Sequence, residues 1–524
     1  MKIKYLGLSV IALGMTLTSC DDFLDELPDN RMELSNVENI KDLLVSAYAD
    51  VNPAYLAEMY SDNADLCQNP GWTEASRFQR QAFEWADITE TGEPEAPQEL
   101  WNGYYRAIAS ANAAIEYIDK LSADEQAEYA PYLGEALLCR AYNMFMLSTV
   151  FCHAYDPATA DKNLGLPYPE HTETVVGQQY KRGTLKDLYG KIDIDLQRGL
   201  PLIKNVYSKP KFHFTQKAAY AFATRFYLNY QKYDESIKCA NVVLGSNPQM
   251  DLRGWSALYS TVQNRQTAPE FFISTDHACN LLLQVVQSEW GAIGGPYQYG
   301  DRYAHGDAIS KNETLEAKFP WGTKTMNAYV WSNKSLSKFI FRKVPYEFEY
   351  TDLQAGIGYA HAEYAVLTTD IALLERAEAN ALAGNYEAAL ADLNTEFKVF
   401  LRGAGASYQA TIEGLKQYYD GVEYYEPKAP TPKKKLTKLV TDTEKQEPLL
   451  QAILQLKRVM TLHEGFRLQD VKRYGIVIYR RTMNSNYDIV DVMDEMKADD
   501  PRLAIQLPQD VITAGLEANP RDNK

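Results

Sequence analysis

The sequence predicts a mainly α-helical protein in which helical hairpins stack side by side, with loop-rich and aromatic-rich segments inserted between them. The clearest observation is the stretch from Ala365 to Leu393, where apolar and small residues recur at helical spacing on both sides of Gly384. Glycine can end the first helix there, and Asn385 can cap a second one. This stretch therefore predicts a helical hairpin.

The second observation is a repeat. The hairpin ends in L-x-G-N-Y-x-x-A-L, which is typical of a tetratricopeptide unit, and a looser copy lies at 229–237. The matching positions are Tyr233, Ser236 and Ile237 in the upstream copy and Tyr386, Ala389 and Leu390 in the downstream one. Because one such hairpin cannot bury its own apolar face, neighbouring hairpins must cover it. We therefore expect a tetratricopeptide-like stack, with the small Ala389 where two helices approach closely.

Length and composition narrow the classes of function. The chain has 524 residues, more than one hydrophobic core usually supports, so large inserted regions are expected. Its formal net charge of −17 argues against a nucleic-acid partner, because phosphate binding requires a surplus of Lys and Arg on one face. The 37 Tyr and 7 Trp exceed what helix packing requires and suit the recognition of ring-shaped ligands.

The N-terminus has the features of an export signal, assigned to residues 1–19. Lys2 and Lys4 precede an apolar run over 6–17, too short to span a bilayer when about 20 residues are needed. Leu17-Thr18-Ser19-Cys20 resembles a bacterial lipobox, so Cys20 is expected to carry the lipid that anchors the protein to a membrane. Residues 20–34 would then be an acidic tether.

The rest of the chain divides into three regions. Residues 35–245 form the N-terminal helical repeat region, in which helices are expected to begin near Ser35, Trp101, Tyr132, Thr184 and Thr215. Residues 246–362 are expected to be a loop-rich insertion with the candidate ligand site, and 363–524 the C-terminal repeat helices.

Two further irregular segments are expected. Residues 61–99 lack a helical period, and 424–447 should be a solvated loop because its lysines lie among prolines.

Catalytic motifs are not found. The sequence contains no metalloprotease, nucleophile-elbow or phosphate-loop pattern, and its seven His are scattered singly. Glu464, Arg467, Asp470 and Arg473 recur every third residue, which suits ion pairs along one helix face and favours a structural role. The protein is therefore expected not to be an enzyme.

Neither cysteines nor acidic loops give a metal-binding framework. Cys67, Cys139, Cys152, Cys239 and Cys279 lack the close pairing of a disulfide or zinc site and are expected to be buried. Asp156, Asp161 and Asn163 could ligate calcium, but their spacing matches no loop template and favours a surface turn. No cofactor is expected, and structural calcium is the one alternative left open.

Several motifs in colinear order resemble the SusD/RagB family of surface lipoproteins. They are S-C-D-D-F-L-D after the signal, Trp101-Asn102-Gly103-Tyr104-Tyr105 with Ala111-Asn112, Gly134-Glu135-Ala136 with Leu138-Cys139-Arg140-Ala141-Tyr142, Gly165-Leu166-Pro167-Tyr168-Pro169, Arg376-Ala377-Glu378-Ala379, and Glu464-Gly465-Phe466-Arg467 with Asp470 and Arg473. The tail is similar to the family's closing I-P and Q-N-P, with Leu507 and Ala518 as departures. The resemblance covers essentially the whole chain.

The resemblance implies an outer-membrane lipoprotein that captures a glycan at the cell surface. Its implied partner is a TonB-dependent transporter of the SusC type, on which the protein acts as a lid. The RagB branch implies a peptide ligand as an alternative. Two alternatives of other classes also remain, namely a surface glycoside hydrolase and a protein-interaction scaffold.

A glycan site requires exposed aromatic rings that stack on sugar faces, with polar side chains beside them. Loop residues among Gly and Pro are the candidates: Trp72, Trp290, Tyr297, Tyr299 and Trp321, with Asn69 and Arg77 as polar partners. Trp290 and Trp321 are preferred, Trp331 follows them, and Trp85 is undecided, whereas Trp101 is expected in the core because it shares a helical register with Tyr104 and Ile108. The resemblance likewise implies a site built from the early loop and the central insertion.

Overall fold

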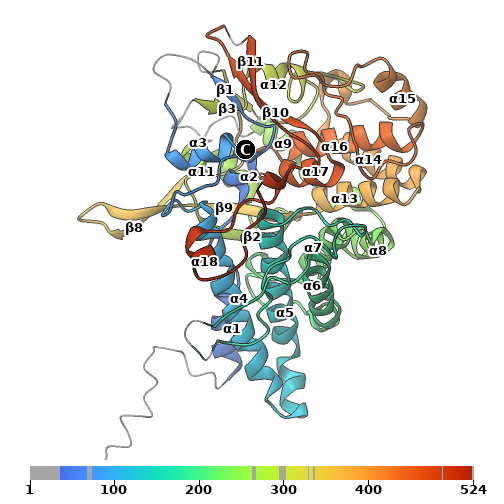
Figure 1. Ribbon diagram of the computed structural model, residues 1–524. Helices are drawn as coiled ribbons and strands as arrows, with labels where there is room; N and C mark the ends of the chain where they lie inside the picture. Colours follow the sequence, from blue (N-terminus) through green and yellow to red (C-terminus); the bar gives the residue numbers. More distant parts are fainter. Residues whose placement is uncertain are drawn as a thin grey trace, which may run out of the picture.

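The computed structural model describes residues 36–67, 73–173, 175, 178–261, 267–293, 302–328, 330–333, 337–486 and 488–521. Helices dominate these residues, and the predicted mainly helical class is confirmed (Figure 1). Predictions on Cys20, the 20–34 tether, Asn69, Trp72, Tyr297 and Tyr299 lie outside the described residues.

The N-terminal region is a layer of helices around one central helix. α5 (Ala123–Phe151) is buried along most of its length because α1 (Val37–Val45), α4 (Pro97–Asp119), α6 (Leu185–Gly199) and α7 (Gln216–Asn229) pack around it. α4 and α5 form the lower lobe in Figure 1. The layer is therefore organised by a helix with no solvent-facing side over much of its course.

Side-chain caps set where several of these helices begin. Thr184 and Thr215 cap α6 and α7 as predicted. The first helix is capped by Asn36, one residue after the predicted Ser35, and the Asn36 side chain accepts from Asn39 N at 3.0 Å. α4 and α5 begin earlier than predicted, because Pro97 suits the first helical position of α4 and Ser122 forms a capping box in front of α5.

The two repeat hairpins lie next to each other, which confirms the predicted stack. α7 and α8 (Tyr233–Leu244) form the first, α13 (Thr369–Leu382) and α14 (Tyr386–Phe400) form the second, and α13 contacts α8. Gly384 has φ +82°, the left-handed conformation that its helix end requires. Ala389 is fully buried, and at the equivalent position the Ser236 hydroxyl donates to Thr224 O at 2.8 Å.

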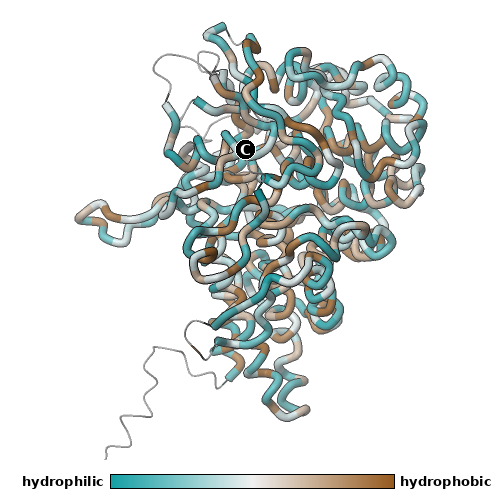
Figure 2. Tube along the Cα trace, in the orientation of Figure 1, coloured by the Kyte–Doolittle hydropathy of each residue, from teal (hydrophilic) through white to brown (hydrophobic). Residues whose placement is uncertain are grey.

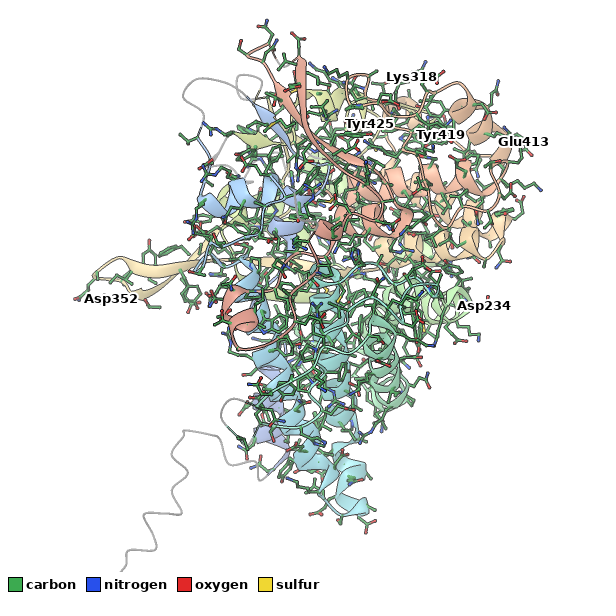
Figure 3. The ribbon with its side chains drawn as sticks, viewed as in Figure 1. Asp234, Lys318, Asp352, Glu413, Tyr419 and Tyr425 are labelled. Atoms are coloured by element: carbon green, nitrogen blue, oxygen red, sulfur yellow. The ribbon has the colours of Figure 1, made fainter. Side chains whose placement is uncertain are left out.

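The central region is not only loops, because an antiparallel sheet crosses it. The strand order is β2-β9-β8, with β2 (Asn280–Gln287), β8 (Glu347–Asp352) and β9 (Ile357–Thr368). The helix predicted from Ala365 begins at Thr369, since 365–368 pair with β2 and Thr368 then caps α13. The β8–β9 hairpin projects from the body, with Asp352 at its outer end (Figure 3).

A second sheet joins parts of the chain that are far apart in sequence. Its order is β11-β10-β1-β3, where β1 (Asp65–Cys67) pairs in parallel with β10 (Ile478–Met483) and antiparallel with β3 (Tyr303–Ala304). β11 (Ile489–Met496) completes it. Residues 61–99, predicted as an irregular loop, thus contain a strand and a short helix, α3 (Arg77–Phe83).

The remaining elements are short, apart from α16, which packs against α13 and α14. They are α2 (Ala54–Tyr60), α9 (Trp255–Thr261), α10 (Thr267–Ile273), α11 (Trp290–Ile293), α12 (Asp307–Asn312), β4 (Lys318–Phe319), β5 (Gly322–Thr323), β6 (Val330–Asn333), β7 (Lys338–Phe341), α15 (Ile412–Asp420), α16 (Gln446–Met460), α17 (Arg467–Tyr474) and α18 (Gln509–Thr513). Within the described residues, short 3₁₀ helices at 200–202, 210–212, 248–251, 403–405 and 501–503 connect some of them.

Apolar side chains form one large core that runs through the helical and sheet regions alike. Hydrophobic and hydrophilic residues alternate along the trace, as expected for elements with one buried face (Figure 2). Cys139, Cys152, Cys239 and Cys279 are buried free thiols, as predicted. None of the helices described is both long and apolar enough to cross a bilayer.

A network of buried charges lies beneath the second sheet. Asp62 accepts two hydrogen bonds from the Arg467 guanidinium, at 2.7 and 2.9 Å, and lies 3.3 Å from Lys434 Nζ. Glu313 lies 2.7 Å from the same Lys434 nitrogen and 3.0 Å from Arg481. The network therefore links α17, the segment after α12, β10 and the stretch that precedes β1.

The sequence placed Lys434 in a solvated loop, and this is wrong. Its ammonium is buried between Asp62 and Glu313 and lies over the ring of Tyr425, 3.2 Å from the centroid. A lysine whose local sequence predicts exposure can be buried when two carboxylates from other elements pair with its ammonium group.

The residues spaced by three around α17 each form a buried ion pair, but mostly with other elements. Arg467 pairs with Asp62; Asp470 with Lys457 at 2.6 Å, Arg473 with Glu378 at 2.6 Å, and Glu464 with Lys343 at 2.6 Å. Only Asp470 and Arg473 also pair along the helix, at 3.8 Å, and Glu464 lies before it. These ion pairs join α17 and Glu464 to other elements, which gives the motif a structural role. The predicted ion pairs along one face of the helix are limited, among these four residues, to Asp470 and Arg473.

Ala389→Leu is expected to overpack the contact between α14 and its neighbours and to lower the free energy of unfolding by roughly 1 to 3 kcal/mol. The measurement is urea denaturation followed by circular dichroism. Ala388→Leu is the matched control, because Ala388 is exposed on the same helix. Equal stability of the two variants would contradict the assigned helix packing.

Asp62→Asn is expected to lower the free energy of unfolding by about 3 to 5 kcal/mol, because it leaves buried cations uncompensated. Asp50→Asn is the control: Asp50 forms an exposed pair with Arg106, at 3.1 Å, and such pairs contribute about 0 to 1 kcal/mol. Similar losses in both variants would contradict the role of the buried network.

The same comparison has a predicted pH dependence. Burial alone raises the pKa of Asp62, but Arg458, Arg467 and Lys434 outweigh it and hold that pKa well below its usual value. The ionised Asp62 carboxylate therefore stabilises the folded protein fully at pH values above the pKa of Asp in the unfolded chain, about 4. This stabilisation is lost as the pH falls towards the lower pKa of Asp62 in the folded protein. The difference in the free energy of unfolding between wild type and Asp62→Asn should therefore become smaller below about pH 4.

Candidate functional site

The early loop and the central insertion lie side by side at the edge of the second sheet. β1 pairs with β3 through Leu66 and Tyr303, and Arg302 N donates to Thr73 O at 3.1 Å. These are the two segments from which the sequence predicts a ligand site.

A polar face lies over this junction, formed by Glu74, Arg77, Arg80 and Arg302. Glu74 lies between the guanidinium groups of Arg80, at 3.6 Å, and Arg302, at 3.7 Å. Arg77 pairs with Glu90 at 2.8 Å, and its side chain is 51% exposed. Charged groups held at the surface in this way can bond the hydroxyls of a bound ligand.

α3 positions two of these arginines. Ser76 caps the helix by accepting from Gln79 N, so Arg77 and Arg80 lie one turn apart and face the same way. The sequence singled out Arg77 but not Arg80, Glu74 or Arg302. The cap at Ser76 followed by arginines three residues apart is the signal that could have identified Arg80, whereas Arg302 is brought in only by strand pairing.

Aromatic rings beneath the polar face belong to the core. Phe83 stacks on Tyr303 with ring centroids 4.5 Å apart. Trp85, undecided from the sequence, is buried; its Nε1 donates to Tyr60 O at 2.8 Å and Arg480 covers its ring. These rings support the face without presenting a surface to a ligand.

Trp290 is in the core, so the expectation that it faces solvent is wrong. It is the first residue of α11 and only 4% exposed. Its ring stacks on Tyr55 with centroids 4.7 Å apart, and its Nε1 donates to His463 O at 2.8 Å. Both the ring face and the polar edge are thus occupied by the protein itself.

Trp321 is also buried, at 3% exposed, and lies away from Trp290 among residues of α14 and β4. Its ring stacks on Phe319, with centroids 4.9 Å apart, and contacts Phe397 at the same distance. The Gly and Pro residues near both tryptophans suggested exposed loops. Pro320 lies in the turn between β4 and β5, whereas Gly291 beside Trp290 lies within α11. Replacing either ring by Ala would leave a cavity that costs about 3 to 5 kcal/mol.

The other two tryptophans considered differ in their surroundings. Trp101 is 9% exposed and packs against Phe151, which confirms its predicted core position. Trp331 is partly exposed on β6, and the Arg342 guanidinium lies over its ring at 5.0 Å.

Three carboxyl groups lie near Trp290, and burial raises the pKa of each of them. Burial raises the pKa of Glu95 to about 8, although Ser288 Oγ and Glu289 N donate to it at 2.5 and 3.1 Å. Burial also raises the pKa values of Glu93 and Glu289. A protonated carboxyl is what a general acid needs, but the Glu95 side chain is sealed in the core and has no access to a glycosidic bond.

Asp156 bonds its own turn, with Oδ1 accepting from Ala158 N at 2.9 Å. Within the described ranges, no group of three or more His, Cys, Asp and Glu side chains is arranged to hold a metal ion.

Comparison with known proteins identifies the fold. A family model described as starch-binding and associating with the outer membrane, SusD-like, matches residues 22–228. A comparison with curated proteins finds no match.

Solved structures match over nearly the whole chain. A Bacteroides vulgatus protein named for sugar binding has 18% identity and a TM-score of 0.65, covering 93% of this chain and 99% of its own. A SusD superfamily protein of Bacteroides thetaiotaomicron has 17% identity and a TM-score of 0.62, covering 93% and 100%. A laminarin-binding SusD-like protein has 15% identity and a TM-score of 0.56, covering 93% and 99%.

These structural matches establish the fold, and the family model establishes the sequence similarity over residues 22–228. The resemblance predicted from the motifs is confirmed: residues 22–228 carry the SusD-like family pattern, and the described chain has the SusD-like fold.

Proposed function

We propose that the protein is a lipid-anchored outer-membrane lipoprotein that captures a glycan at the cell surface and delivers it to a SusC-type TonB-dependent transporter. The SusD-like family pattern and the sugar-binding names of its structural neighbours support the ligand class. The transporter partner and the lipid anchor rest on the family resemblance and on the lipobox at Cys20.

One observation carries the location of the glycan site, namely the backbone hydrogen bond that joins Thr73 to Arg302. Trp72 immediately precedes Thr73, and Tyr297 and Tyr299 lie within five residues of Arg302. The proposal brings these three rings to one site on this sequence spacing, because a chain of n residues reaches at most about 3.6 Å × n.

The chemistry of the junction suits a sugar. Trp72, Tyr297 and Tyr299 would supply stacking surfaces, and Asn69 with Arg77 would bond hydroxyls. Arg80, Glu74 and Arg302 add charged partners already held at the surface. The site proposed here keeps the predicted segments and replaces the buried Trp290 and Trp321 with this polar face.

Trp72→Ala is expected to weaken glycan binding about tenfold or more, since truncating a stacking anchor typically costs more than 1 kcal/mol. Arg77→Ala should weaken it less. The measurement is a glycan-array screen of residues 21–524 followed by isothermal titration with the selected oligosaccharide. The thermal melt of Arg77→Ala should stay nearly unchanged, because the Arg77 pair is exposed.

Arg198→Ala is the matched control, because Arg198 forms a comparable exposed pair with Asp119 on the helical layer. A wild-type protein that binds peptides and no glycan would contradict the proposal in favour of a peptide ligand. Release of reducing ends during the titration would favour a glycoside hydrolase, and failure to bind either ligand class would favour the scaffold.

Cys20→Ser is expected to abolish acylation and to leave an exported protein in the soluble fraction, because the lipid is the proposed anchor. The measurement is labelled-palmitate incorporation together with membrane fractionation. Protease shaving of intact cells tests surface exposure in the wild type. Membrane association that persists in Cys20→Ser would contradict the anchor.

A further inference from the structure

A groove of about 890 Å³ lies on the helical layer, between α4, the segment 167–180 and the chain around α18. Its volume is within the 300 to about 1,000 Å³ typical of small-molecule sites. α18 lies beside α4 in Figure 1, and Gln98 Nε2 donates to Asp510 Oδ2 at 3.2 Å between them. On the other side, Tyr105 Oη donates to Pro167 O at 2.8 Å.

The floor of the groove is a stripe of α4. Trp101, Tyr105 and Ala109 recur every fourth residue, so they lie along one helix face. The rings of Trp101 and Tyr105 are tilted at 46° with centroids 4.7 Å apart, and the floor beyond them is made of small side chains. Trp101 lies mainly in the core and exposes only 9% of its surface, so the half-buried Tyr105 is the main aromatic contribution to this floor.

The walls are polar without a surplus of charge. Asn102 and Gln178 contribute amide groups, and Tyr180 adds a further ring. Arg106 and Glu173 are the lining residues that carry full charges of opposite sign, and Arg106 is paired with Asp50. Such a lining suits neither a phosphate group nor a strongly acidic or basic ligand.

The secondary structure of the lining argues against a peptide added as a strand. The residues that line the groove belong to helices and connecting segments, and none lies in a strand with a free edge. The rings of Tyr105 and Tyr180 beside neutral amide groups instead match a ligand whose ring faces are apolar and whose edges carry hydroxyl groups.

We propose that this groove is a second carbohydrate site, which takes a neutral oligosaccharide. It shares no residue with the Glu74, Arg77 and Arg302 face, so the two sites would hold separate segments of one glycan or two glycans. The inference rests on the proposed glycan-binding function. It gives the protein a second site for the glycan. Long glycan chains that reach both sites would therefore bind more tightly than short ones.

The test fills the groove without disturbing the core. Ala109 is exposed on its floor, so Ala109→Trp places a ring in the groove. Ala127→Trp is the matched control, since Ala127 is exposed on α5 outside the groove. Gln178→Ala removes one wall amide and has little scope to affect folding, because Gln178 is exposed.

Isothermal titration with laminarihexaose and maltohexaose, and with any neutral oligosaccharide selected on the array, gives the readout. Two molecules per chain are expected for wild type and Ala127→Trp, and one for Ala109→Trp. Gln178→Ala should weaken one of the two sites several-fold. The double variant Ala109→Trp with Trp72→Ala should lose measurable binding.

The outcomes separate this inference from the proposed function. One molecule per chain, bound equally by wild type and Ala109→Trp and lost in Trp72→Ala, overturns the second site and leaves the first in place. Binding lost in Ala109→Trp but retained in Trp72→Ala supports the groove and overturns the face at Thr73 and Arg302. Wild-type protein that binds no oligosaccharide overturns both.

Discussion

The buried charges around Asp62 and Glu313 are the constraint on which the rest of the structure depends. Two carboxylates and the cations of Lys434, Arg458, Arg467 and Arg481 lie together away from water. Removing charges from water is costly, and a buried cluster is tolerated only when every member finds its partner. The segments that carry these groups are therefore held in one relative arrangement.

That arrangement determines where the candidate glycan face can form. Asp62 leads into β1, whose two neighbours in the sheet are β10 from the C-terminal region and β3 from the central insertion. Arg481 lies on β10 and reaches both Asp65 and Glu313. Ion pairing beneath the sheet and hydrogen bonding within it thus act together to place Thr73 beside Arg302, which is the junction assigned to the ligand.

The helical layer has a different role. Its hairpins bury apolar faces against one another and against α5, and they provide a stiff surface onto which connecting segments fold. The groove beside α4 arises in this way. Tyr105, Asn112 and Glu116 of α4 bond the segment 167–172 on one side, and Gln98 bonds Asp510 of α18 on the other.

The sequence by itself determined the helical class, the repeat hairpins, several caps and the family resemblance. These follow from local patterns: the spacing around Gly384, the Thr184 and Thr215 caps, and motifs in a fixed order. Only the tertiary structure decided which aromatic rings are buried and which charges meet. Trp290 and Trp321 lie near turn residues, yet Tyr55 and Phe397, far away in sequence, cover them. Lys434 lies among prolines, yet Asp62 and Glu313 bury it. Burial depends on long-range contacts that periodicity within a short window does not contain.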